Sequence, residues 1–287
     1  MMLLQEEINV GEMVLHHAAD AWTLDFYPLG TIHLPRFADV HLGPITLNLS
    51  PTKHVVFMVL AAVLVFLTMK LAGRSLARQR AGEHAPSGFA NAVEGLVLFV
   101  RNDVCIANIG HDGAKFAPLI MSLFFFILYG NLLGLIPWGA SPTGNLAVTG
   151  ALALLVLVTV EVSGFLKLGA KGYLGTIFPH FPGLTGVGAT VMAVAMSPIE
   201  VMSKLVKPFA LAVRLFGNMT AGHFVILSLF GIVFLFGHLG AASWGIGIVT
   251  AMLVTGIMLL ELIVAVLQAY VFALLSSVFI GLMQHEH

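Results

Sequence analysis

The chain has 287 residues, of which 59% are hydrophobic and only 9% charged, and its formal net charge is −1. Soluble domains carry about 25% charged residues, so this composition excludes an ordinary soluble domain and indicates a membrane protein. A net charge near zero argues against nucleic acid as a partner. The single cysteine, Cys105, excludes an internal disulfide.

Residues 1–52 are mixed in character and predict an N-terminal arm, with no cleaved signal or transit peptide. An apolar segment follows at about 54–73, close to the ~20 residues that a spanning helix needs. It ends among cations, which are Lys70, Arg74, Arg78 and Arg80. By the positive-inside rule its C-terminal end is cytoplasmic, so the arm is expected on the outer side.

Residues 86–104 differ, because apolar side chains recur every three or four positions among polar ones. This spacing predicts an amphipathic helix on the membrane surface. Two spans are then expected at about 115–136 and 146–167. Their connection holds no basic residue, whereas Lys115, Lys167 and Lys171 mark the other ends, so the connection is predicted outside.

A loop rich in glycine and proline is expected at about 169–186, before two long apolar blocks at 188–236 and 241–284. As continuous helices the two blocks would measure about 73 and 66 Å, against a hydrocarbon core of about 30 Å. Neither block has a polar turn at its middle, so two long, strongly tilted helices are predicted. The fold class is therefore an all-α polytopic membrane protein. It has about five membrane-embedded helices and one amphipathic surface helix, forming a single membrane domain over 53–287.

Arg214 lies in the middle of the first long block. A guanidinium stays protonated at any accessible pH. At the centre of a bilayer it costs about 2.5–3.5 kcal/mol on insertion scales. Such a cost indicates a transport pathway, or a partner that supplies the opposite charge.

Other polar residues share the helical face of Arg214, because their spacings are near-whole turns. They are Glu200, Ser203, Lys207 and Asn218. His223 is expected about half a turn away. The second long helix carries Glu261 and Gln268, seven residues apart on one face.

Structural roles are the alternatives for these residues. Glu200 and Lys204 have the spacing of a helix-surface ion pair, and Lys207 is placed to snorkel to the interface. Asn218 and His223 could serve helix packing, and Arg214 could form a buried ion pair with Glu261. The histidines match no metal motif, so neither metal nor cofactor is expected.

At this point the sequence resembles a known family. The run Lys207–Gly222, with Arg214 and Asn218 inside it, resembles the signature of subunit a of F-type ATP synthases. The run from Glu261 through Gln268 and Tyr270 resembles the last helix of that family, and Tyr129–Pro137 resembles its third. The resemblance implies a stator subunit of a bacterial inner membrane, with its N-terminus outside and its C-terminus cytoplasmic. The implied partners are the c-subunit ring, the b subunits of the peripheral stalk and the lipid bilayer.

The resemblance also implies roles for single residues. Arg214 matches the essential arginine that faces the ring carboxylates. Asn218, His223, Glu261 and Gln268 match the half-channel open to the outside, and Glu200 and Ser203 match the one open to the cytoplasm. There are two departures from the pattern of many bacterial members. The acid and the histidine are exchanged between positions 223 and 261, and Gly134 replaces an aspartate.

The function expected is proton translocation by a non-catalytic subunit, with Arg214 separating two offset half-channels. No phosphate-binding glycine loop is present, so ATP chemistry belongs to other subunits. The alternative is a self-contained secondary transporter that uses Arg214 for an anionic substrate. Against it, no inverted repeat or paired broken helices are seen. A membrane metallo-hydrolase lacks its His-Glu-x-x-His motif.

Overall fold

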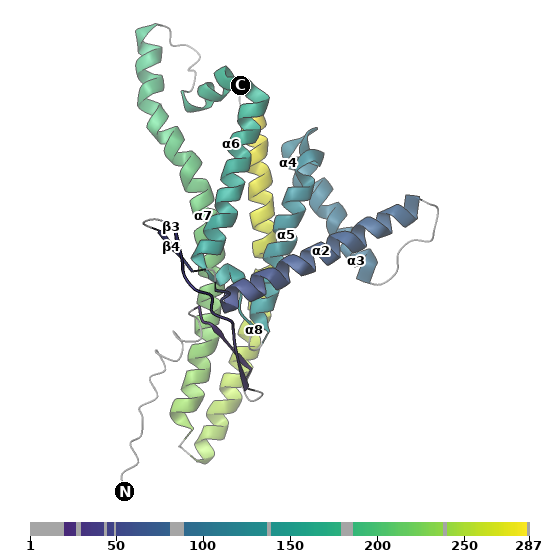
Figure 1. The fold of residues 1–287 in the computed structure, drawn as a ribbon, viewed down its shortest axis with the longest axis vertical. Coiled ribbons are helices and arrows are strands. Elements are labelled where there is room, and N and C mark those ends of the chain that lie inside the picture. Colours follow the sequence, from purple (N-terminus) through teal and green to yellow (C-terminus); the bar gives the residue numbers. More distant parts are fainter. Residues whose placement is uncertain are drawn as a thin grey trace. The chain divides into compact units, whose positions relative to one another are not determined.

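The computed structural model describes residues 20–26, 30–42, 45–48, 50–80, 89–136, 139–178, 186–237 and 240–285. These residues are mostly helical (Figure 1). Five helices among them are long and apolar enough to cross a membrane. The elements in chain order are β1 (Thr23–Phe26), β2 (Gly30–His33), β3 (Val40–Leu42), β4 (Ile45–Leu47), α2 (Lys53–Arg80), α3 (Phe89–Phe99), the π-helix η1 (Val100–Ile106), α4 (Ala107–Ile109), α5 (Gly113–Leu135), the 3-10 helix η2 (Pro142–Gly144), α6 (Leu146–Ile177), α7 (Val187–Phe236) and α8 (Ala241–His285).

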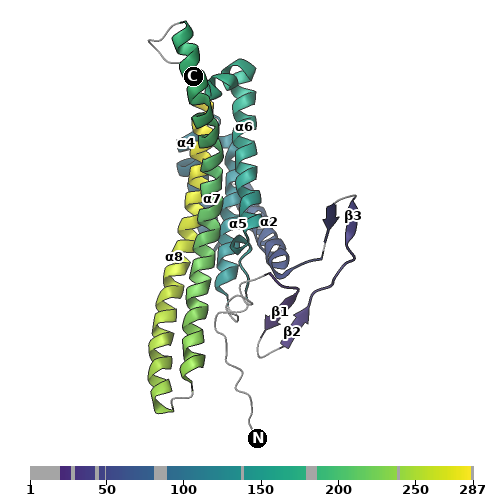
Figure 2. The same cartoon turned by 90° about the vertical axis from the view of Figure 1, so that its left-hand side faces the viewer.

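The N-terminal arm contains two small antiparallel hairpins, visible as arrows in Figure 2. In the first, Thr23 pairs with His33, and in the second, Val40 pairs with Leu47. No strand was expected here from the sequence. Strands of three or four residues are too short to give a clear alternation of apolar and polar side chains. Residues 1–19 lie outside the described part of the arm.

The two long apolar blocks form two long helices, which confirms that part of the predicted fold class. α7 has 50 residues and α8 has 45. Pro198 and Pro208 lie inside α7 without ending it. Each proline removes one backbone hydrogen bond from the helix, and helices that cross membranes commonly tolerate this.

Helix α6 departs from the expected boundaries, because a loop was expected from about residue 169. The helix instead continues to Ile177 after a break at Gly169, where φ is 68° and ψ is 177°. A side chain disfavours a left-handed φ, whereas glycine adopts it readily. Gly169 therefore turns the chain and lets helical structure resume. Residues 179–185 of the expected loop lie outside the described residues.

The amphipathic segment also differs in detail from the single helix expected at 86–104. α3 starts at Phe89, the first described residue here, and passes into the seven-residue π-helix η1 and then the short α4. π-Helices are rare and nearly always short. No hydrophobic periodicity distinguishes one in advance.

The chain divides into two compact units, and neither is continuous in sequence. Unit 1 comprises Met1–Ala61, Tyr129–Asn145 and Phe216–Leu267. Unit 2 comprises Ala62–Leu128, Leu146–Leu215 and Gln268–His287. Each unit is described separately below.

Unit 1 is built around a helical hairpin. The end of α7 and the beginning of α8 run side by side in both views (Figures 1 and 2). The buried apolar side chains of this unit include Ala61, Met219 and Ala265. Several buried side chains here are polar, and these provide the first candidate site.

Unit 2 holds the large apolar core. Its fully buried side chains include Phe125 on α5, Leu211 and Leu215 on α7, and Phe272 and Ile280 on α8. Aromatic and branched side chains of this size bury the most apolar area per residue. α6 packs against α8, since Met283 occupies the space beside Gly164.

A charged network ties the start of α5 to α6 in unit 2. Asp112 accepts hydrogen bonds from the ammonium groups of Lys115 at 2.8 Å and Lys167 at 3.0 Å. These bonds lower the pKa of Asp112 to about 2, and the bond from Lys115 has the largest effect. Lys167 also donates to Gln284 on α8, at 3.3 Å. The network therefore links three helices of this unit.

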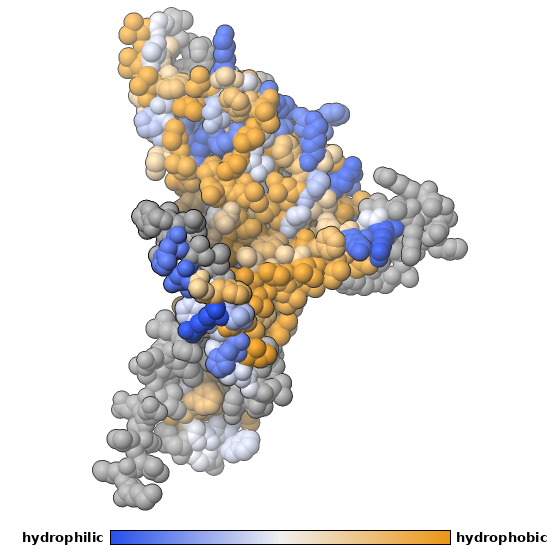
Figure 3. All heavy atoms as spheres, in the orientation of Figure 1, coloured by the Kyte–Doolittle hydropathy of each residue, from blue (hydrophilic) through white to orange (hydrophobic). Residues whose placement is uncertain are grey.

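Exposed apolar side chains cover much of the surface (Figure 3). Along α2 they include Val55, Val59, Val63 and Phe66. In water such continuous apolar surface would be unfavourable. It is the surface expected of a helix that faces lipid or another membrane protein.

Candidate functional site

The first site, in unit 1, centres on the buried acid Glu261 of α8. Its residue is only 4% exposed. A Cβ atom added at Gly222 of α7 would lie 2.6 Å from Oε1 of Glu261 and 2.9 Å from its carboxyl carbon. A side chain at position 222 would therefore displace the Glu261 carboxyl from the place it occupies beside α7. Neither oxygen of Glu261 has a hydrogen-bond partner among the described residues.

His223, next to Gly222, lines a cavity of about 40 Å³ in the same unit. Other polar groups on its wall are Lys53 and His54 at the start of α2, Ser141, and Thr220 on α7. A cavity of this size has room for at least one water molecule, and its polar wall could hydrogen-bond it. Glu261 accepts no hydrogen bond, so none joins it to His223 in this structure. The predicted relay between these two residues stays a prediction.

His54 is buried on this wall and is held by the N-terminal arm. Its Nδ1 lies 2.7 Å from Oδ1 of Asp20, the first described residue of the arm. Burial by itself raises the pKa of Asp20. The hydrogen bond and charge of His54 act the other way, and the pKa is lowered overall. The arm is thus fixed to the start of α2 by a charge-assisted contact.

Asn131 of α5 is fully buried and joins three parts of unit 1. Its Nδ2 donates to the carbonyl of Ala265 on α8 at 3.2 Å, and its Oδ1 accepts from the Thr143 hydroxyl at 2.5 Å. The hydroxyls of Thr143 and Ser141 lie 2.7 Å apart. One side chain therefore binds both α8 and the connection between α5 and α6.

Gly134, where an aspartate was expected from the resemblance, lies on the same face of α5. A Cβ there would meet the Cβ of Ser141 at 2.5 Å and the methyl group of Met219 at 3.3 Å. Any side chain at position 134 would displace the connection that carries Ser141. In this chain a closely packed glycine therefore stands at position 134, where many members have an acid.

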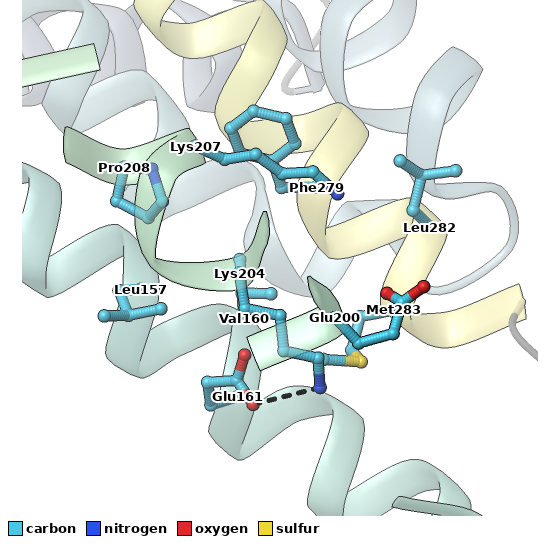
Figure 4. A pocket seen from close by; sticks show the side chains of 10 residues that line it. All are labelled: Leu157, Val160, Glu161, Glu200, Lys204, Lys207, Pro208, Phe279, Leu282 and Met283. Carbon is cyan, nitrogen blue, oxygen red and sulfur yellow. Dashed lines mark ion pairs between the residues drawn. The ribbon is translucent and has the colours of Figure 1, made fainter. Parts of the chain in front are cut away.

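The second site is a pocket of about 50 Å³ in unit 2, formed by α6, α7 and α8 (Figure 4). Glu200, Lys204 and Lys207 reach it from α7, Glu161 from α6 and Phe279 from α8. In Figure 4 the Lys204 side chain extends to Glu161, whereas the Glu200 carboxylate points away from that pair. Glu200 has no ion pair with another described residue.

Lys204 makes three contacts with α6. Its Nζ donates to the Thr176 hydroxyl at 2.7 Å and lies 3.6 Å from Oε2 of Glu161. It also lies 4.8 Å from the centre of the Tyr173 ring, within cation–π distance. The Glu200–Lys204 ion pair that their spacing allowed is therefore not formed.

Arg214 is exposed on α7, and no described residue of unit 2 gives it a hydrogen bond or an ion pair. Ser203 is half-buried and Gln268 is buried, both in unit 2. Asn218 is exposed on the part of α7 that belongs to unit 1. Among the described residues of unit 1, no cation lies within ion-pairing distance of the Glu261 carboxylate.

The structure thus brings Glu261 close to the residue before His223, and gathers Glu200 with two lysines. Sequence reasoning did not single out Glu161, whose partners lie on α7 and beyond the Gly169 break. An acid inside the apolar run 146–167 was the available signal, because intramembrane acids are functional candidates by default. It also missed the pairing of Asp20 with His54, for which spacing offered no signal.

Long apolar helices with polar residues placed singly along them indicate a multi-pass membrane protein with candidate functional residues inside the membrane. The comparison with known families narrows this class. The family model described as ATP synthase A chain matches residues 55–281. The chain belongs to this family, whose members are non-catalytic subunits of the membrane sector of the proton-transporting ATP synthase.

Bacterial relatives agree over most of their length. The chain is 44% identical to ATP synthase subunit a 2 of Chlorobaculum tepidum, over 96% of this chain and 74% of the relative. It is 41% identical to ATP synthase subunit a of Chloroherpeton thalassium, over 95% and 77%. With ATP synthase subunit a of Myxococcus xanthus the identity is 45%, over 84% and 76%. The chain is therefore a multi-pass bacterial membrane protein of a complex that contains a c-ring.

Proposed function

We propose that this chain translocates protons through two offset half-channels against the rotating c-ring, with Arg214 separating them. The proposal rests on the exposure and the contacts of Arg214. The guanidinium is exposed on a long apolar helix and has no partner among the described residues of unit 2. Because it cannot lose its proton, a balancing charge from another molecule would stabilise it. A carboxylate of the c-ring would supply that charge.

We assign the half-channel open to the outside to Asn218, His223, Glu261 and Gln268. Two features of unit 1 support this assignment: the polar cavity beside His223 and the buried, unpartnered carboxyl of Glu261. The wall of the cavity includes Gly139 and Gly144, from the connection that lacks basic residues. The positive-inside rule puts such a connection on the outer side.

We assign the half-channel open to the cytoplasm to Glu200 and Ser203. The pocket of unit 2 supports this assignment, because it is polar and surrounds the unpaired Glu200. Its lysines, Lys204 and Lys207, fit a cytoplasmic surface. The proposed topology has the N-terminus outside and the C-terminus in the cytoplasm.

The mechanism follows from electrostatics. A proton driven across the membrane gains about 2.3 kcal/mol per 100 mV. Arg214 favours the ionised form of a ring carboxylate that faces it, so a proton leaves that carboxylate before it passes the arginine. A fixed positive charge between the two aqueous routes also repels protons that would leak directly. Net proton flow then requires the ring to turn.

The remaining partners follow from the surface. The exposed apolar side chains of α2 suit contact with the lipid bilayer or with the b subunits of the peripheral stalk. Purification of the complex from membranes tests both this and the transporter alternative. A stator subunit brings a c-ring and b subunits with it, whereas a self-contained transporter purifies without them.

Arg214→Lys tests the central assignment. The variant keeps a positive charge but replaces a planar group with a compact ammonium, which can lose its proton when buried. We expect the complex to assemble and ATP-driven proton pumping in membrane vesicles to be lost. Arg101→Lys, at an exposed arginine of η1 outside the candidate spans, is the matched control. Near-normal pumping by Arg214→Lys would refute the role of Arg214.

A further inference from the structure

Glu200 and Lys204 stand four residues apart on α7, the spacing at which an acid and a lysine ordinarily pair across one helical turn. In this structure the lysine is turned to α6 instead, and Glu200 has no cationic partner among the described residues. An available ion pair is thus left unformed inside a pocket. Something must hold Lys204 away.

Three groups of α6 hold it, and their chemistry is complementary to an ammonium. The Thr176 hydroxyl accepts a hydrogen bond at 2.7 Å, the Glu161 carboxylate supplies the opposite charge at 3.6 Å, and the Tyr173 ring lies beneath the cation at 4.8 Å. The side chain of Lys204 is only 16% exposed, so these contacts take the place of most of its water. Together they satisfy a charge that would be costly to bury alone.

The acid of this group is also fixed. Tyr173 donates its hydroxyl proton to Oε2 of Glu161 at 2.5 Å. In a straight helix these residues would be about 18 Å apart along the axis, beyond the reach of a tyrosine. The left-handed break at Gly169 turns the chain back, so that Tyr173 and Glu161 meet. The backbone of α6 is therefore shaped to build this contact.

We propose that Glu161, Tyr173 and Thr176 form a clamp that holds Lys204 away from Glu200 and so keeps the Glu200 carboxyl free to exchange protons in the pocket. This inference rests on the proposed role of Glu200 in the cytoplasmic half-channel. Glu161 is a positioning residue in this scheme, since it acts through Lys204. Were Lys204 to pair with Glu200, the ammonium would favour the ionised carboxylate and resist its protonation.

Glu161→Gln tests the clamp while preserving the shape of the side chain and an oxygen for Tyr173. Without the charge of Glu161, Lys204 is expected to move to Glu200. We expect ATP-driven proton pumping to fall about fivefold, the order of effect of a partly exposed ion pair. The double variant Glu161→Gln with Lys204→Gln should restore pumping, because the side chain at position 204 then carries no charge to pair with Glu200. Loss of pumping without restoration would overturn the clamp in favour of a purely structural role for Glu161.

A second measurement does not depend on pumping. The only native cysteine, Cys105, is buried, and burial raises its pKa to about 11, so it reacts poorly. In a Cys105→Ser background, Glu200→Cys reports on its surroundings through its rate of reaction with a negatively charged methanethiosulfonate. Adding Glu161→Gln should raise this rate about fivefold, because a nearby ammonium promotes the thiolate. Adding Lys204→Gln should remove the increase.

The outcomes separate the two ideas. Thiol rates that do not change with Glu161→Gln overturn the clamp, whatever the pumping results are. Normal pumping by Glu200→Gln overturns the proposed role of Glu200 in proton exit, independently of where Lys204 lies. Faster thiol reaction, reduced pumping and restoration by the double variant together support the clamp.

Discussion

Glu261 of unit 1 differs in its surroundings from Glu161 and Asp112 of unit 2. In unit 1 the Glu261 carboxyl is buried against Gly222 with no hydrogen-bond partner among the described residues. In unit 2 Glu161 is bound by Tyr173 and Lys204, and Asp112 by two lysines. An acid with partners is explained by the stability of the fold. A buried acid without them is not, because burying an unpaired polar group costs free energy.

This difference separates acids whose contacts stabilise the fold from Glu261, whose presence is better explained by function. Glu161 and Asp112 connect helices, so each can be understood from the contacts within unit 2. The Glu261 carboxyl connects no helices by a hydrogen bond among the described residues, and it can gain or lose a proton. The predictions below test this difference.

The largest effect is expected from Gly222→Val, which removes the space that the Glu261 carboxyl occupies. The first added carbon alone would lie 2.6 Å from Oε1. Overpacking of this kind costs about 1–3 kcal/mol, and here it also displaces the Glu261 carboxyl that we assign to the half-channel. We expect proton pumping to be abolished and the melting temperature of the purified complex to fall. Gly247→Val on α8 is the control, because a Cβ there meets nothing within 4 Å.

A smaller effect is expected from Glu261→Gln. The amide cannot relay a proton by titrating, so passive proton conductance of vesicles stripped of the catalytic head should fall at least about tenfold. Assembly should be unaffected, since no hydrogen bond to the carboxyl is lost. The double exchange His223→Glu with Glu261→His should recover much of the conductance, because one acid and one imidazole are kept. Conductance no better than that of the worse single variant would refute the coupled pair.

The smallest effect is expected from Asp112→Asn in unit 2. The pKa of Asp112 is lowered to about 2 in the folded chain, below its ordinary 3.8. Its contribution to stability is therefore present above pH 3.8 and is lost as the pH falls towards 2. The variant should melt slightly below the parent at pH 7, and the two melting curves should converge in acid. A difference that persists at pH 2 would show that charge is not the cause.

The sequence predicted the long helices because runs of apolar residues of this length rarely form any other structure. Arg214 stood out in the sequence because a charge inside such a run has no ordinary explanation, and its role stays a prediction. The boundaries of α6 were not, because a glycine in a Gly/Pro-rich stretch predicts a loop as readily as a helix break. Gly169 can be recognised as a break only when the chain on both sides is seen to be helical.

Contacts between distant residues were also beyond the sequence. Asn131 is part of the family resemblance, yet its partner Ala265 lies 134 residues along the chain. The pairing of Lys204 with Glu161 rather than Glu200 was the less expected choice, because local spacing favoured Glu200. Such pairings depend on how the helices pack against one another, and the periodicity within one helix does not predict that packing.

The bond from Asn131 to the Ala265 carbonyl has a mechanical consequence. A carbonyl oxygen has two lone pairs, so it can accept the Asn131 amide in addition to a hydrogen bond within its own helix. Sliding α8 by one residue would move the next carbonyl about 1.5 Å along the axis and about 100° around it, out of reach of the amide. A smooth apolar interface would resist such slippage weakly, whereas this single bond marks one register of α8 against α5. In the proposed function, in which the ring turns against this chain, such a fixed register would help α8 to resist the torque of the ring.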